Sequence, residues 1–169
     1  MNLRLSSSVC YADYADDIDM GDLGQDALIR SLGGLMLASK AMGRAALMLI
    51  VDAEPEWHSF LARLHNMETR WSRQLRLAIT GMDAALPPDV DGLHQRIVQH
   101  PDPIDRFAAI RDELERAVAE LDMLLPRIRH ETLQESLRMM RADLRVSLAQ
   151  AARSLAAKVG DATSPAITD

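Results

Sequence analysis

Cysteine is almost missing from this sequence, and aromatic residues are few. A single cysteine, Cys10, excludes an internal disulfide framework and a zinc site built from several cysteines, and it fits a reducing compartment. No apolar run is long enough to span a membrane, and the first ten residues contain no apolar stretch of the length that a secretion signal needs. These absences predict a cytoplasmic protein without a membrane partner.

The abundant residues are good helix formers. The hydrophobic fraction is 48% although only 4% of residues are aromatic, and leucine, alanine, methionine, arginine and glutamate dominate. There is no glycine-rich phosphate loop and no G-x-S-x-G nucleophile motif. The composition predicts an all-α fold with one domain.

Apolar residues recur at three- and four-residue steps in four long segments, which is the period of a helix with one buried face. These segments are residues 23–51, 55–82, 104–125 and 132–158, and residues 91–100 could form a short additional helix.

The lengths of the connections predict the topology. The first and third connections are short, whereas the second is long enough to run back along a whole helix. The chain is therefore predicted to form two antiparallel hairpins joined by a crossover, which makes an antiparallel four-helix bundle over residues 22–158. Residues 1–21 would be an acidic N-terminal arm, and residues 159–169 a C-terminal tail.

Charge is unevenly distributed along the chain. Residues 1–26 contain six aspartates and one arginine, a local charge of −5, whereas residues 127–158 carry seven Lys and Arg against three acids, a local charge of +4. We expect the arm, with Tyr11 and Tyr14, to lie over an arginine strip on the last helix or to compete with a partner there. That strip consists of Arg138, Arg141 and Arg145. A nucleic-acid-associated regulator that uses the strip is a weaker alternative, because the net charge of the chain is −6.

One carboxylate lies on the apolar face of the second segment. Glu68 falls between Leu64 and Trp71, and Ser39 lies at the middle of the apolar face of the first segment. An ionisable group in such a place lowers stability if it has no polar partner. Otherwise it is a structural carboxyl with a hydrogen-bond partner, or the remnant of a metal site. We predict a buried polar core of Glu68, Ser39 and Trp71, with a buried arginine, the Trp71 N–H or a serine as the partner of Glu68. If a metal is bound, Glu68 and His65 are the candidate ligands, but no metal and no cofactor are expected.

The segments METRWSRQL and LLPRIRHETLQESLRMM resemble the ferritin-like superfamily of four-helix bundles, and the resemblance covers about residues 28–155. Di-iron proteins of that kind use a Glu from each of two helices and a Glu-x-x-His from each of the other two. The resemblance places one ligand at Glu68 and another near Ser39, which is no carboxylate. Trp71 stands where the histidine of a Glu-x-x-His would be, and the chain contains no such motif. This implies a ferritin-like scaffold that has lost the di-iron chemistry.

These patterns favour a non-enzymatic accessory protein that acts by binding a protein partner. The alternative is an oxidase-like enzyme of the ferritin family with a di-iron or mononuclear site. The first helix also has a second apolar face, which a monomer would expose and which predicts a homodimer; the competing account is that the arm covers it. This face consists of Leu37, Ala41, Ala45 and Met48.

Overall fold

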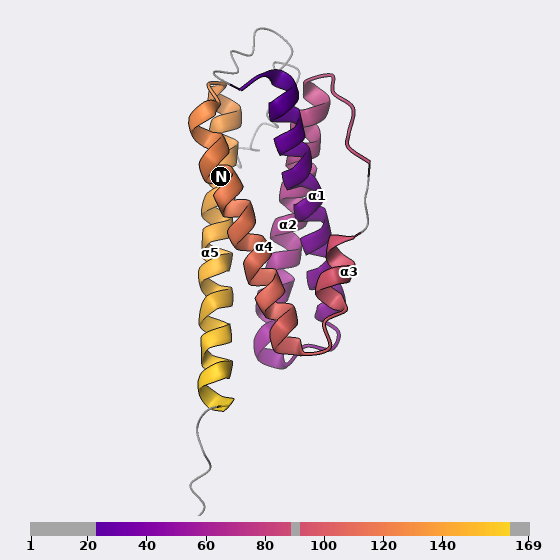
Figure 1. Ribbon diagram of the computed structural model, residues 1–169, viewed down its shortest axis with the longest axis vertical. Helices are drawn as coiled ribbons and strands as arrows, with labels where there is room; N and C mark the ends of the chain where they lie inside the picture. The colour runs from indigo at the N-terminus through magenta and orange to yellow at the C-terminus, as the bar shows by residue number, and fades with distance from the viewer. Residues whose placement is uncertain (1–22, 89–91, 163–169) are drawn as a thin grey trace, which may run out of the picture.

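The computed structural model describes residues 23–88 and 92–162, and this part of the chain is helical without a strand (Figure 1). The all-α prediction is therefore confirmed. Its elements in chain order are α1 (Gln25–Leu49), α2 (Pro55–Gly81), α3 (Leu93–Val98), α4 (Pro103–Leu124), the 3-10 turn η2 (Leu125–Arg127) and α5 (Glu131–Ala162). The last helix ends at Ala162, beyond the boundary at residue 158 that the sequence pattern predicts.

Proline and side-chain caps set several of the helix ends. Pro55 and Pro103 begin α2 and α4, where the missing N–H of proline costs nothing because it would have no helical partner. The Asp102 side chain caps α4 by accepting a hydrogen bond from the Ile104 backbone N–H at 2.8 Å. Beyond α2, Asp83 takes a positive φ of 53°, so the chain turns away from the helix axis there.

The helices pack in two neighbouring pairs. Helix α1 lies against α2 and helix α4 lies against α5, while α1 also contacts α4 and α2 contacts α5 (Figure 1). Leucines and isoleucines of all four long helices, together with both tryptophans and both phenylalanines, form one buried apolar core. Burial of this apolar surface supplies most of the driving force for folding.

The connection between the two pairs is anchored on α1. Its short helix α3, which the sequence pattern predicts, packs on α1, and Ile97 is its buried residue. Pro87 lies over Gly33 so closely that a Cβ added at Gly33 would be 3.1 Å from Pro87 Cγ. The crossover is thus a packed element that covers part of α1. No helix among the described residues is both long and apolar enough to cross a membrane.

Candidate functional site

Two buried polar side chains meet at the interface of α1 and α2. Glu68 and Ser39 are only 2% and 3% exposed, and the Ser39 hydroxyl is hydrogen-bonded to the Glu68 carboxyl. Burial raises the pKa of Glu68 to about 7, and the hydrogen bond from Ser39 opposes this rise. Among the described residues, Glu68 Oε2 has no hydrogen-bond partner. A carboxyl in these surroundings is about half protonated at neutral pH and is not a fixed anion.

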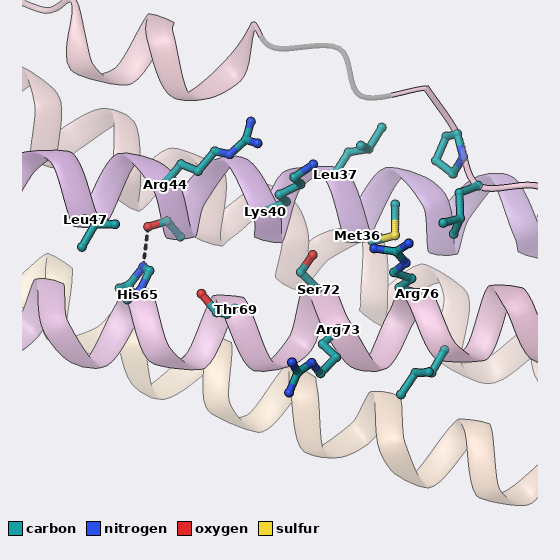
Figure 2. A pocket seen from close by; sticks show the side chains of 14 residues that line it. Met36, Leu37, Lys40, Arg44, Leu47, His65, Thr69, Ser72, Arg73 and Arg76 are labelled. Atoms are coloured by element: carbon teal, nitrogen blue, oxygen red, sulfur yellow. Dashed lines mark hydrogen bonds between the residues drawn. The ribbon is translucent and has the colours of Figure 1, made fainter. Parts of the chain in front are cut away.

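His65 joins the same two helices one turn earlier in α2. Its Nδ1 donates a hydrogen bond of 2.8 Å to the backbone oxygen of Gly43, because a carbonyl oxygen can only accept (Figure 2). Gly43 is buried, and a Cβ at this position would lie 3.4 Å from Thr69 Oγ1 and 3.5 Å from Glu68 Cβ. The structure therefore brings Ser39, His65 and Glu68 to one interface, where His65 and Glu68 each make a contact from α2 to α1.

Trp71 belongs to a different polar contact. Its ring is buried, and Nε1 donates a hydrogen bond of 3.1 Å to Oδ2 of Asp143 on α5. Arg70 pairs with the same carboxylate, and its guanidinium lies 5.0 Å from the centre of the Trp71 ring. Of the three partners that the sequence allowed for Glu68, the serine is found, whereas the Trp71 N–H is not its partner because Asp143 accepts that hydrogen bond.

The predicted arginine strip on α5 has acidic partners within the chain. Arg141 and Arg145 both form ion pairs of 2.9 Å with Asp122 on α4, and these contacts hold the pKa of Asp122 below its ordinary value. Arg138 pairs at 3.6 Å with Glu135, one turn away on the same helix. The strip therefore connects α5 to α4. Tyr11, Tyr14 and the rest of the predicted arm lie outside the described residues.

The second apolar face of α1 is only partly exposed, contrary to the expectation that a monomer would expose all of it. Ala45 is completely buried, whereas Leu37 and Ala41 are half-buried and line a cavity of about 320 Å³ between α1, α3 and α4. Met48 is 51% exposed. The packing of α3 on α1 is the physical reason, since the crossover covers the first half of this face.

No group of three or more His, Cys, Asp and Glu side chains that could hold a metal ion is found in the described part of the chain.

The structure also contains a basic groove that no pattern in the sequence predicts. It has a volume of about 630 Å³, runs along α1 and α2 on the side where the crossover begins, and no carboxylate is among its lining residues (Figure 2). We call this feature the basic groove. Its lining from α1 includes Met36, Leu37, Lys40, Gly43, Arg44 and Leu47; its lining from α2 includes His65, Thr69, Ser72, Arg73, Arg76 and Leu77; Leu86 and Pro87 close one end.

Helical spacing explains why this groove cannot be predicted from the sequence. Arg73 and Arg76 are three residues apart on α2, and Lys40 and Arg44 are four apart on α1, so each pair alone resembles an ordinary solvated helix face. The rotation of each helix about its own axis decides whether the two pairs line the same groove. The close approach of the helices at Gly43 is the one sequence signal that bears on it.

Comparison with known families gives one finding. The family model of DUF6306, a domain of unknown function, matches residues 26–153, which includes most of α1 and all of α2, α3 and α4. No curated protein and no solved structure matches the chain.

Proposed function

The chain belongs to the DUF6306 family, and from its own geometry we propose that it is a non-enzymatic accessory protein that acts by binding another protein. We propose further that its scaffold is a ferritin-like antiparallel four-helix bundle and that it works in the cytoplasm. The observation that carries the non-enzymatic part of the proposal is the contact of Glu68 with Ser39 between α1 and α2.

The chemistry of that contact favours a structural role. A metal ligand has to be deprotonated, and hard cations are held by several ionised carboxylates that approach one another across the helices. Here a serine faces the buried Glu68, and a carboxyl whose pKa is near 7 is half protonated at neutral pH. Trp71, at the place of a ligand histidine, donates its N–H to Asp143. The polar groups of the core are thus used for helix packing.

The packing pattern supports the proposed scaffold. Contacts run from α1 to α2, from α2 to α5, from α5 to α4 and from α4 back to α1, so the four long helices form a closed ring around one core. The short α1–α2 connection and the long link from α2 to α4 also favour this proposal, because a ferritin-like topology needs one long crossover.

Iron reconstitution tests the proposed function. The protein is incubated with ferrous iron without oxygen, exposed to air, desalted and assayed for bound iron and for oxo-bridge absorption. We expect well under one iron per chain and the same amount in a Glu68→Gln variant, because any remaining iron sits on surface carboxylates. About two irons per chain that are lost in Glu68→Gln would instead show a di-iron site at Glu68 and overturn the metal-free account in favour of the oxidase-like alternative.

We also propose self-association through the exposed end of α1. Leu47 and Met48 are each 51% exposed and Val51 is 78% exposed, so three large apolar side chains lie together at this end of the helix. An exposed apolar cluster on an acidic protein is a common mark of an interface, and a twofold pairing of this end with itself is the simplest closed arrangement.

A further inference from the structure

We propose that the acidic N-terminal arm, residues 1–21, binds in the basic groove of its own chain. This inference goes beyond the proposed function, because the occupancy of the groove does not depend on whether the core binds metal. It rests on the charge, the lining and the position of the groove.

Positively charged side chains line this groove from two helices. Lys40 and Arg44 line it from α1 and Arg73 and Arg76 from α2, and Arg76 extends across to α1 beside Met36 (Figure 2). Arg73 and Arg76 are exposed, and their guanidinium groups form no ion pair or hydrogen bond within the described part of the chain. A concave surface that gathers cations without a carboxylate in its lining attracts an anionic ligand.

The arm has the complementary charge. Residues 1–21 contain four aspartates and one arginine, a local charge of −3, which makes the arm more acidic than the C-terminal tail of a chain whose net charge is −6. The arginine strip on α5 is the competing site, but Asp122 already neutralises part of its charge by pairing with Arg141 and Arg145. Arg73 and Arg76 therefore offer the arm positive charge that no carboxylate among the described residues pairs with, whereas Arg138, Arg141 and Arg145 of the strip are all paired.

The groove and the arm also match in their apolar parts. Met36, Leu77 and Leu86 supply apolar surface, and the hydroxyls of Thr69 and Ser72 point from α2 toward α1 (Figure 2). In the arm, Tyr11, Tyr14 and Ile18 alternate with aspartates over YADYADDID, so a single short segment carries both kinds of group. A ligand with interleaved acidic and apolar side chains fits this lining better than a small inorganic anion does.

The arm is long enough and starts in the right place. It joins the fold next to Leu23, which is 5% exposed, and α1 begins at Gln25. From Gln25 the groove lies between about 17 and 33 Å along the helix, at 1.5 Å per residue to Met36 and Leu47. Twenty-one extended residues span up to about 70 Å. Because the arm is tethered, its effective concentration at the groove reaches about the millimolar range, which lets weak contacts suffice.

Cys10 provides the test in the full chain. A nitroxide label on this single cysteine broadens the NMR signals of backbone amides that come near the arm. In labelled ¹⁵N protein we expect loss of signal intensity at Lys40, Thr69 and Arg73, and recovery when the salt concentration is raised. The charge-reversing double variant Arg73→Glu/Arg76→Glu should abolish this loss. Arg127→Glu/Arg153→Glu, a matched pair of exposed arginines outside the groove, should preserve it.

A charge swap makes the test independent of folding defects. Adding Asp16→Lys/Asp17→Lys to the Arg73→Glu/Arg76→Glu chain should restore the broadening at Lys40 and Thr69. Broadening centred on Arg141 and Arg145 instead, or no localised broadening, would overturn the proposal. Broadening of unlabelled ¹⁵N protein mixed with nitroxide-labelled ¹⁴N protein would also overturn it, since the arm of a second copy would then fill the groove.

Discussion

At the scale of single residues, Glu68 is the side chain with the most unusual chemistry. It is buried at the contact of α1 with α2, and its pKa is about 7 in place of the ordinary 4.5. Ser39 supplies the hydrogen bond, and the neutral acid avoids the cost of a buried charge. Such a group links protein stability to pH.

Stability should therefore fall as the pH rises from about 4.5 through 7. Below 4.5 both the folded and the unfolded chain hold the Glu68 proton, whereas between these values the unfolded chain releases it and the folded chain keeps it. A shift of this size corresponds to about 3 kcal/mol, which is lost by the time the pH is well above 7. Urea unfolding of wild type and of Glu68→Gln between pH 5 and pH 8 measures the effect.

The glutamine variant should show a flatter pH dependence and should exceed wild type in stability at the upper end. The free energy of unfolding of Glu68→Leu should also change little with pH. It should be lower than that of Glu68→Gln by about 1–3 kcal/mol, because leucine leaves the buried Ser39 hydroxyl without its partner. Parallel curves for wild type and Glu68→Gln would show that Glu68 keeps an ordinary pKa.

The hydrogen bond of Trp71 gives a second prediction at this scale. Trp71→Phe keeps a buried ring but removes the donor to Asp143, so we expect a loss of about 1 kcal/mol or somewhat more. In a double-mutant cycle with Asp143→Ala, the two losses should be clearly less than additive. Additive losses would mean that the two side chains do not interact.

At the scale of elements, two adjacent glycines in α1 distinguish a covered from an open helix face. Among the described residues, a Cβ at Gly34 would meet only Glu120 Oε1, at 3.8 Å, whereas a Cβ at Gly33 would lie 3.1 Å from Pro87 Cγ. Gly34→Ala should therefore stabilise the protein by about 1 kcal/mol through helix propensity alone. Gly33→Ala should stabilise the protein clearly less than Gly34→Ala, or destabilise it, because the crossover has to move to make room for the methyl group. Equal gains in thermal unfolding would place the crossover away from α1.

Which elements form could largely be predicted from the sequence, because local rules decide it. The three- and four-residue period of Leu28, Leu32 and Leu35 is enough to identify α1 and its inward face, and Pro55 and Pro103 mark helix starts. What the crossover covers could not be predicted. A loop's path depends on long-range packing such as that of Ile97, and a short apolar segment in the sequence does not specify which helix it will contact.

The same limit applies to the candidate site. Glu68 could be found because a lone carboxylate interrupts an apolar stripe, but its partner depends on the register between α1 and α2. The basic groove also depends on that register, because arginines of α2 and a lysine of α1 have to line the same groove. Asp122 lies among ordinary charged positions of α4, so nothing in the sequence marks it as the partner of Arg141 and Arg145.

At the scale of the whole molecule, the exposed end of α1 predicts a concentration-dependent dimer. Met48→Glu should shift sedimentation to the monomer at micromolar concentration, because it places a charge in the proposed interface. Met139→Glu is the matched control, since Met139 is 56% exposed on α5. A wild-type protein that stays monomeric over the whole concentration range would rule out this self-association.

The most direct test of the central claim, that the polar core serves packing and not metal chemistry, is the titration of Glu68 itself. The carboxyl carbon of Glu68 is followed by ¹³C NMR from pH 4 to pH 9, with Glu68→Gln for assignment, in the absence and in the presence of ferrous iron under nitrogen. The account predicts one titration with a midpoint near 7 that iron leaves unchanged. A carboxyl signal that disappears with iron, or a midpoint that iron drives to low pH, would contradict it, because a metal-bound carboxylate stays ionised.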